Sequence, residues 1–516
     1  MLRSDQKFDD KNSANATNIE NASLEQGTGF EASRQTSTLA EILKNRRIVL
    51  WCLLLYLLPI NYGYEMTMVG KLYAAPAFQR QFGQEYEGVW TIKTSGQQLL
   101  NSANTIGVFV SACLNGFISD YLGRKWVVVI ASFICCAGVI LQGFSFDVYT
   151  LFGGKLLGNM GVGLGFSLGP VFVAELAPES FRGLALAFMN TMIVLGQWAN
   201  SLTIYGCSFR HDEWAWRLPL FVQVIPPGIL LILSLLILPE SPSWLMIHGK
   251  EEQALRALKI FEGKGVDAEA SLEAIKRAVE MEKAASQTQK ESSWRDCFKG
   301  PNLRRTIIVI MVFCGQQWVG VTFIAGYLPY YFSLAGVKNA LGVAQGAFAI
   351  QLFGNVCSWP LVDRVGRRPL MVSGCFAIVV GLVIIGCINI KRSDASLKAT
   401  VALITMWGFI YQATLGAITY SVGGETPSPR LRQKTLSIAI AISTSFTGLW
   451  MQVTPFLVNP DKANLGGKIC FVFLGPSLIY CTYLFFCLPE MKGRSVEKLE
   501  EMFQERIPAR EFRKYH

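Results

Sequence analysis

The chain has 516 residues, of which 51% are apolar and only 16% are charged, and its mean hydropathy is +0.34. Typical soluble proteins carry about 25% charged residues, whereas here the apolar residues gather in runs of about 20, enough to cross about 30 Å of hydrocarbon as a helix. This composition excludes a soluble enzyme, and with 3 His in the whole chain a histidine-built metal site is not expected.

The first 45 residues are polar and lack an apolar segment of signal-peptide length, which predicts a disordered cytosolic tail. Beyond this tail, twelve apolar stretches predict an all-α membrane protein with twelve transmembrane helices. The first six cover approximately 48–69, 99–118, 126–144, 151–173, 184–204 and 218–238, and the other six cover 306–332, 343–362, 369–390, 399–422, 435–457 and 469–488.

A long polar insert separates the two sets of stretches. Residues 239–305 are rich in Lys, Arg and Glu, and they include the amphipathic helical patterns EEQALRALKIF and LEAIKRAVEMEK, which are too charged to enter a membrane. We therefore expect an N-terminal six-helix half at 46–238, a cytosolic helical linker at 239–305, a C-terminal six-helix half at 306–488 and a cytosolic tail at 489–516.

The net charge of +10 could suggest a nucleic-acid partner, but Lys and Arg cluster in short segments between the apolar runs, where they set membrane orientation. With twelve spans, one side carries the basic segments DYLGRK, the linker, DRVGRRP, SPRLRQK and the C-terminal tail. This predicts a multi-pass protein with both termini cytosolic, placed in the plasma membrane, and no nucleic-acid partner. The loop with Lys391, Arg392 and Lys398 breaks the pattern on the outside.

The two halves repeat one another. The segment that starts at Asp120 recurs 243 residues later at Asp363, and the Glu175 and Pro239-Glu240 positions both recur 250 residues later. Three pairs at nearly one offset indicate an internal duplication. Two such halves with a site between them are typical of alternating-access carriers.

The repeated D-x-x-G-R-[RK] turns place an acid and two bases at the cytosolic rim, where they can pair with charges on neighbouring helices and with helix ends. We interpret them as a cytosolic gate, although loops that are basic only to fix topology are the alternative. The gate would consist of Asp120, Arg124, Lys125, Glu175, Arg182, Asp363, Arg367, Arg368, Glu425, Arg430 and Arg432.

The combined motifs resemble the sugar porter family of the major facilitator superfamily over about residues 45 to 510. The likeness rests on DYLGRK, PVFVAELAPESFRG, PESPSWL, GQQWVG, DRVGRRPL and PEMKGRSVEKLEEMF. Fungal α-glucoside (maltose-type) permeases are more similar still, in GYEMTMVGKLYAAPAFQRQFG, DEWAWRLPL, ITYSVGGETPSPRLRQKT, TPFLVNPDKANLGGK and ERIPAREFRKY. The resemblance implies a major facilitator fold and a secondary active transporter that moves a sugar or a sugar-like polyol through a lipid bilayer.

The resemblance also implies a sugar site near the bilayer midplane. Its positions hold Asn190, Gln316, Gln317, Thr322, Gln351, Gln412 and Tyr420 in this chain. Buried amides both donate and accept hydrogen bonds, as the hydroxyls of a polyol require, although hydrogen bonding between helices is an alternative role. The family's residues differ at Asn190, Thr322 and Tyr420, and the shorter amide and smaller aromatic leave room for a ligand that is larger than a simple hexose or differently shaped.

Two opposite charges interrupt the apolar spans. Glu65 lies late in the first stretch and Lys155 lies in the fourth, and such charges are costly unless they are paired or functional. In proton-coupled sugar porters these positions hold Asp and Arg, so the resemblance implies proton symport with Glu65 as carrier and Lys155 as partner. The alternative is an exposed Glu65 at the outer mouth and a snorkelling Lys155.

Other classes of function remain open. A facilitator or an exporter of a non-sugar metabolite is one alternative, because a fold hosts many functions, and a non-transporting nutrient sensor is another. The sequence contains no G-x-x-x-x-G-K-[ST] loop for ATP and no nucleophile constellation, so neither an enzyme nor a cofactor is expected. The 13 Cys lie mostly inside apolar runs, which favours membrane packing over disulfides or a metal site.

Overall fold

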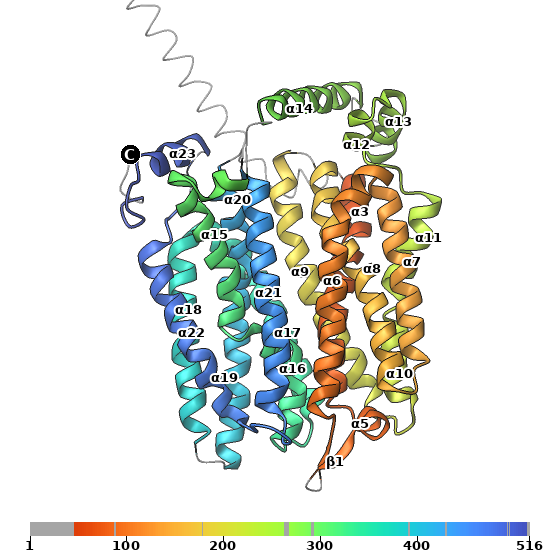
Figure 1. The fold of residues 1–516 in the computed structure, drawn as a ribbon, viewed down its shortest axis with the longest axis vertical. Coiled ribbons are helices and arrows are strands. Elements are labelled where there is room, and N and C mark those ends of the chain that lie inside the picture. The colour runs from red at the N-terminus through yellow and green to blue at the C-terminus, as the bar shows by residue number, and fades with distance from the viewer. Residues whose placement is uncertain are drawn as a thin grey trace, which may run out of the picture.

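The computed structural model describes residues 46–512, apart from short gaps at 87–88, 178, 263–267, 290–293, 391–392, 429–430, 493 and 495. The tail expected at 1–45 and the last four residues of the C-terminal tail lie outside this description. The described residues are almost entirely helical and form one upright bundle (Figure 1).

The bundle consists of two sets of six spans. The first set contains α3 (Arg46–Leu55) continued by α4 (Leu57–Leu72), then α6 (Thr94–Leu122), α7 (Arg124–Gly143), α8 (Val148–Leu176), α9 (Glu179–Cys207), and α10 (Trp214–Val222) continued by α11 (Ile225–Leu236). The second set contains α15 (Gly300–Trp318) continued by α16 (Val321–Leu334), then α17 (Ala340–Val365), α18 (Arg367–Ile388), α19 (Asp394–Ala413) continued by α20 (Leu415–Glu425), α21 (Arg432–Val458) and α22 (Ile469–Cys487).

Eleven of these spans are long and apolar enough to cross a membrane. The twelfth is α9, which has 29 residues and stands among the others in Figure 1. The predicted all-α architecture of twelve spans is therefore confirmed. Several helices exceed the predicted apolar stretch; α6, for example, includes polar turns at both ends beyond 99–118.

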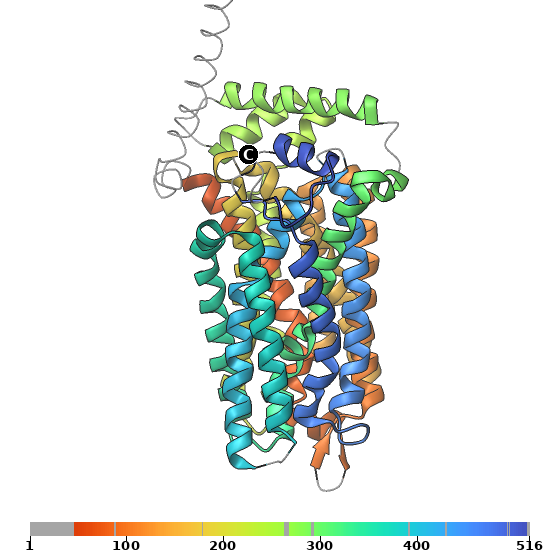
Figure 2. The ribbon, with the colours of Figure 1, turned by 90° about the vertical axis from the view of Figure 1, so that its left-hand side faces the viewer.

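One end of the bundle, here called the linker end, carries α12 (Pro242–Ile247), α13 (Glu251–Glu262), α14 (Ala268–Gln289), η1 (Trp294–Phe298) and α23 (Val496–Gln504) (Figures 1 and 2). Acidic residues in the first turn of α13 and Lys259 in its last turn complement the helix dipole. The apolar face of α13 packs on the first half, where the ring of Phe261 lies edge-on to that of Trp51 at 5.4 Å.

The second half holds α23 against the same end of the bundle. Arg305 is 3% exposed, and its Nη1 donates a 2.6 Å hydrogen bond to the Glu500 carboxylate. Its guanidinium group also lies 4.5 Å from the ring centroid of Phe503. One buried cation therefore fixes both the polar and the apolar side of α23.

The opposite end, here called the hairpin end, carries α5 (Pro76–Phe82), the antiparallel strands β1 (Gln84–Tyr86) and β2 (Val89–Thr91), and η2 (Gly466–Lys468). Hydrogen bonds join the two halves here. The hydroxyls of Thr91 and Tyr330 are 2.6 Å apart, and Thr94 Oγ1 donates to Asp461 Oδ1 at 2.6 Å. Asp461 also accepts from the backbone N of Thr94 at 3.3 Å, so it caps the start of α6 from the other half.

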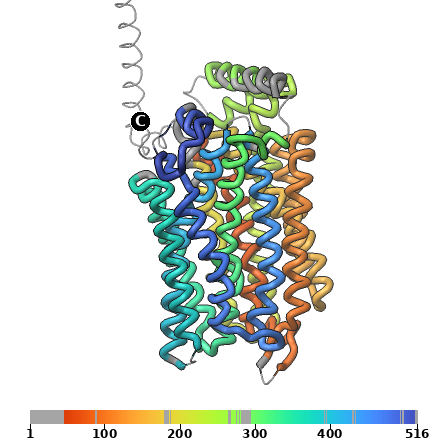
Figure 3. Tube along the Cα trace, turned by 60° about the vertical axis from the view of Figure 1, so that its left-hand side comes forward, coloured from red at the N-terminus to blue at the C-terminus, as the bar shows by residue number. Residues whose placement is uncertain are grey.

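Three pairs of helices form most of the boundary between the halves: α4 with α16, α6 with α21, and α9 with α17. Figure 3 shows α6 and α21 side by side. A Cβ atom on Gly70 of α4 would lie 2.1 Å from the carbonyl oxygen of Gly326 on α16, so glycine is required for this close approach. The halves are therefore closed against one another toward the hairpin end.

Several spans are interrupted inside the bundle. α15 and α16 are separated at Gly320, which has a left-handed backbone with φ +90, while α19 gives way to α20 at Thr414. α10 gives way to α11 around Gln223, just before Pro226 and Pro227, which cannot donate backbone hydrogen bonds. Such breaks direct polar groups into the bundle at membrane depth.

Candidate functional site

Glu65 on α4 and Lys155 on α8 form an ion pair inside the first half. Their side chains are 1% and 2% exposed, so the alternative of an exposed Glu65 and a snorkelling Lys155 is wrong. Two amides also donate hydrogen bonds to the Glu65 carboxylate: Asn159 Nδ2 donates to Oε1 at 2.8 Å, and Gln223 Nε2 donates to Oε2 at 2.7 Å. The sequence analysis missed both amides.

Close helix packing encloses this pair. A Cβ atom on Gly107 of α6 would lie 2.8 Å from Cβ of Asn159, and one on Gly63 of α4 would lie 2.0 Å from the Ile193 carbonyl oxygen. Larger residues at either glycine would push the helices apart. At such a buried site each charge depends on its partner, because removing one member of a buried pair costs about 3–5 kcal/mol.

The predicted amides of the seventh span lie beside its interruption. Gln316 and Gln317 end α15, and Thr322 lies in the first turn of α16. Thr322 Oγ1 donates to Gln317 Oε1 at 2.8 Å, so the structure brings these two predicted residues together. The Nε2 group of Gln316 is buried and has no hydrogen-bond partner in the described part of the chain.

A second cluster joins α9, α17 and α19 through Asn355, which sequence analysis did not predict. Asn355 Oδ1 accepts from Thr191 Oγ1 at 2.7 Å, and its Nδ2 donates to Gln412 Oε1 at 3.4 Å. Asn190, the residue before Thr191, has a buried Nδ2 group without a partner among the described residues. Asn355 thus links Thr191 of the first half to Gln412 of the second.

The remaining two predicted sugar residues lie apart from these contacts. Gln351 is 3% exposed and packs against Gly408 on α19, where a Cβ atom would lie 2.7 Å from its Cγ. Its Nε2 group also lacks a partner among the described residues. Tyr420 on α20 is 50% exposed, with its ring edge-on to that of Phe313 at 5.6 Å.

Three of the predicted positions therefore have unused hydrogen-bond donors: Asn190, Gln316 and Gln351. Buried polar groups are nearly always satisfied by protein, water or a ligand. Several unsatisfied amides inside the bundle are what a ligand rich in hydroxyl groups would require.

A small cavity lies between the halves on the hairpin side of these residues. It is lined from five helices by Met66, Val69, Gly70, Asn101, Asn104, Lys155, Thr322, Gly326, Tyr327 and Met451. Lys155 of the ion pair and Thr322 of the predicted sugar site both reach this cavity, so the two parts of the candidate site adjoin.

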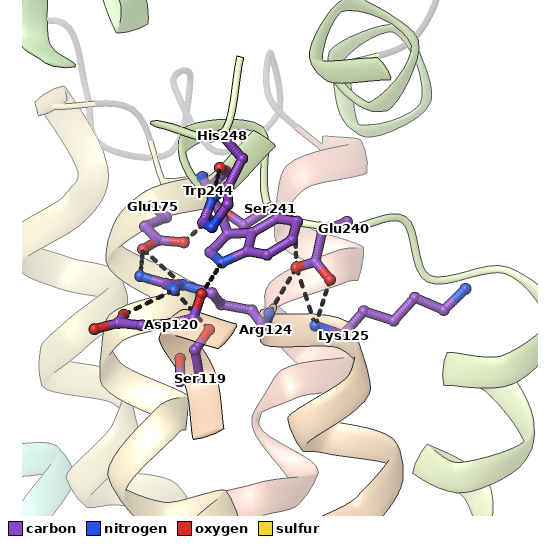
Figure 4. A network of polar contacts seen from close by, with 9 residues as sticks. All are labelled: Ser119, Asp120, Arg124, Lys125, Glu175, Glu240, Ser241, Trp244 and His248. Carbon is purple, nitrogen blue, oxygen red and sulfur yellow. Dashed lines mark hydrogen bonds and ion pairs between the residues drawn. The ribbon is translucent and has the colours of Figure 1, made fainter. Parts of the chain in front are cut away.

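The predicted gate of the first half is a connected network at the linker end (Figure 4). Arg124 Nη2 lies 3.1 Å from Glu175 Oε1, and Arg124 Nη1 lies 3.4 Å from the largely exposed carboxylate of Asp120. Glu240 Oε1 accepts from the backbone N of Arg124 at 2.7 Å and from that of Lys125 at 3.1 Å. Lys125 thus acts through its backbone, while its side chain points away from the network.

The position of Glu240 explains why the repeated motif has glycine at residue 123. Gly123 has φ +93, and a Cβ atom there would lie 2.3 Å from Glu240 Oε2. Burial raises the pKa of the Glu240 carboxyl, while backbone N–H groups of Ser241, Lys125 and Arg124 act in the opposite direction. Ser241 also donates its hydroxyl to Glu175, which links the two carboxylates.

The second half repeats this arrangement. Arg367 Nη2 donates to Glu425 Oε1 at 2.9 Å, and Glu490 accepts from the backbone N of Arg367 and of Arg368 at 3.1 Å each. Gly366 has φ +100 and lies against Glu490. Of the other predicted gate residues, Arg432 has a buried Nε group without a partner in the described chain. The side chains of Arg182 and Asp363, and all of Arg430, lie outside the described residues.

Comparison with known proteins places this geometry among membrane transporters. The family model "Sugar (and other) transporter" matches residues 51–503. The general alpha-glucoside permease of Saccharomyces cerevisiae is 26% identical over 511 residues, which cover 98% of this chain and 83% of the permease. The MFS transporter fmqE of Aspergillus fumigatus is 26% identical over 497 residues, which cover 94% of this chain and 92% of fmqE.

Solved structures show the same fold. The inward-open xylose transporter XylE from E. coli superposes with a TM-score of 0.71 at 21% identity, covering 88% of this chain and 99% of XylE. The proton:xylose symporter structure of XylE with 6-bromo-6-deoxy-D-glucose gives a TM-score of 0.68 at 22% identity, covering 89% and 99%.

Proposed function

Because the chain belongs to the sugar (and other) transporter family and is a multi-pass membrane transporter with the major facilitator fold, we propose that it carries an α-glucoside by proton symport. The curated relatives named alpha-glucoside permeases support the substrate class. The observation that carries the proposal is the fully buried Glu65–Lys155 pair, whose lysine lines the same cavity as Thr322 of the predicted sugar site.

The amides would bind the sugar. Asn190, Gln316 and Gln351 have free N–H donors, and Gln317 with Thr322 offers a hydroxyl and an amide at the break between α15 and α16. Each can exchange hydrogen bonds with sugar hydroxyls, and the interruption lets this part of the seventh span rearrange as the halves rock. Gln412 and Tyr420 would complete the site from α19 and α20.

Glu65 would carry the proton. In this conformation the carboxylate accepts hydrogen bonds from Lys155, Asn159 and Gln223. A proton that binds Glu65 when the hairpin end opens neutralises the carboxylate and frees Lys155 from it. After the hairpin end closes, Glu65 would release the proton on the other side and pair with Lys155 again. The proton gradient would in this way drive the sugar inward.

We further propose that the linker end faces the cytosol, with both termini on that side, and that the chain resides in the plasma membrane. The basic loops support this orientation by the positive-inside rule. The pairs Arg124–Glu175 and Arg367–Glu425 would then act as cytosolic gate elements, each bracing one half while the halves move as units.

The test is uptake of labelled maltose by yeast that lack their own sugar transporters and express this chain. We expect uptake to rise at acidic external pH and to collapse when an uncoupler removes the proton gradient. Glu65→Gln should abolish accumulation and its pH dependence while maltose exchange across the membrane persists. Unchanged pH dependence in Glu65→Gln would exclude Glu65 as the carrier.

A facilitator or exporter of another metabolite is the second candidate. The departures from the sugar porters' residues at Asn190, Thr322 and Tyr420 favour it. Surface expression with no uptake of maltose or glucose would support this candidate over the α-glucoside importer. A nutrient sensor would instead bind the sugar without moving it.

A further inference from the structure

The helix α6 has a polar face that the proposed sugar site does not use. Gln97, Asn101 and Asn104 are all buried, and their spacing of four and three residues places them on one side of the helix. The opposite side presents Phe109 and Phe117 as exposed apolar residues. Polar residues on one face of a membrane helix are expected to line a cavity or contact another helix.

Asn104 lines the cavity between the halves and lacks a strong partner there. Its side chain is enclosed, with 5% exposure, and the contact that the described residues offer its Nδ2 is the sulfur of Met66 at 3.7 Å. A thioether is a weak acceptor. Asn104 is therefore a buried amide with unused hydrogen-bond capacity, aimed into a cavity that also reaches Thr322.

Asn101 lies one turn nearer the hairpin end and closes the same cavity. Its Nδ2 donates to Tyr327 Oη and to the Met451 carbonyl oxygen, both at 2.6 Å and both in the second half. These bonds must break when the hairpin end opens. The amide then loses two protein acceptors, and hydroxyl groups of a ligand can replace them at little cost in free energy.

The cavity also offers the apolar surface that a sugar ring needs. Met66, Met451 and the ring of Tyr327 line it beside the two amides, and aromatic rings present a flat face for apolar contact. In this closed conformation the cavity has room for about one water molecule. It can accept a ring only when α6 moves away from α16 and α21.

We propose that Asn101 and Asn104 form a second sugar subsite, which binds the outer ring of an α-linked disaccharide while the predicted amides bind the inner ring. The inference rests on the proposed function and deepens it. It assigns α6 to recognition of the glycoside's length, because a single ring held by the amides of α15 and α17 would leave Asn101 and Asn104 on α6 without a sugar hydroxyl.

The test compares uptake of maltose with uptake of methyl α-glucoside, which has the same linkage chemistry and a single ring. In Asn104→Ala we expect the KM for maltose to rise about tenfold, which corresponds to about 1.4 kcal/mol. The KM for methyl α-glucoside should stay within about twofold of the wild type, as expected when only one ring loses a hydrogen bond. Asn104→Ser, which keeps a hydroxyl, should shift the maltose KM less and in the same direction, and it serves if the alanine variant fails to reach the membrane.

Asn115→Ala is the matched control, because Asn115 is a buried amide on the same helix nearer the linker end and does not line the cavity. It should leave the ratio of the two KM values unchanged. Equal changes for both sugars in the Asn104 variants would assign Asn104 to gate closure and overturn the subsite, as would no change for either. If the wild type moves neither glycoside, the proposed function fails before any variant is compared.

Discussion

Removing one charge of the Glu65–Lys155 pair should destabilise the protein far more than removing both. Glu65→Gln leaves the Lys155 ammonium without a counter-ion at 2% exposure, and a new amide N–H must face the donors of Lys155, Asn159 or Gln223. Lys155→Met leaves a buried carboxylate that keeps two amide donors. The double variant removes both charges and fills the site with neutral groups of similar volume.

The structure sets the size of each effect. Breaking a buried ion pair costs about 3–5 kcal/mol, whereas replacing both members is nearly neutral or even stabilising. Each amide bond to a charged group contributes about 1.5–3 kcal/mol, so Lys155→Met should lie near the lower end of the range and Glu65→Gln near the upper end. The free energy of unfolding of the double variant should lie within about 2 kcal/mol of the wild-type value. The two single effects would then exceed the double effect by several kcal/mol, which is the coupling energy of the pair.

The assay is a double-mutant cycle on the free energy of unfolding of the purified protein in lipid nanodiscs. The exposed pair Arg210–Asp212, with side chains 53% and 47% exposed, provides a control cycle in which no coupling is expected. If the effects of Glu65→Gln and Lys155→Met simply add in the double variant, the two residues do not form a desolvated pair and the coupling mechanism loses its basis.

Three further outcomes test other parts of the structure. Gly123→Ala should lower the melting temperature, because it adds about 1 kcal/mol of backbone strain and crowds Glu240. The control Gly153→Ala, which has open space around it, should not lower it. Equal melting temperatures for the two variants would contradict the role of Gly123. Arg305→Met should release α23 and speed proteolysis of the C-terminal segment, and an unchanged cleavage rate would show that Arg305 does not hold it. Asp461→Ala removes the cap of α6 supplied by the other half, so amide hydrogen exchange in the first turn of α6 should accelerate, and exchange at the wild-type rate would refute the cap.

The fold could be predicted because its signals are local. Runs of apolar residues predict the spans, and the recurrence of the Asp120 segment at Asp363 predicts the two halves. The interruption at Thr414 could not be predicted in this way, because Gly416, two residues later, is one of many glycines in the spans and does not distinguish a break. The break around Gln223 has a signal in Pro226 and Pro227, but mean hydropathy over a span conceals it.

In the candidate site, too, local signals could be predicted and contacts between distant helices could not. Glu65 and Lys155 stand out because charges are rare in apolar spans, and their contact is confirmed. Their amide partners Asn159 and Gln223 come from separate helices, and no local pattern indicates that they meet. Asn101 gives a weaker signal, because average hydropathy over α6 conceals the spacing of four and three residues between Gln97, Asn101 and Asn104.

The ion pair and its amide partners all belong to the first half, whereas Gln316, Gln317, Thr322, Gln351, Gln412 and Tyr420 all belong to the second. A gene duplication has thus produced two copies that can evolve under different selection. Substitutions in the second copy can change the cargo without disturbing the charged cluster in the first. Divergence among relatives that keep this layout should therefore concentrate in the second half, on α6 and at Asn190 wherever cargo differs, and around Glu65 and Lys155 wherever the energy source differs.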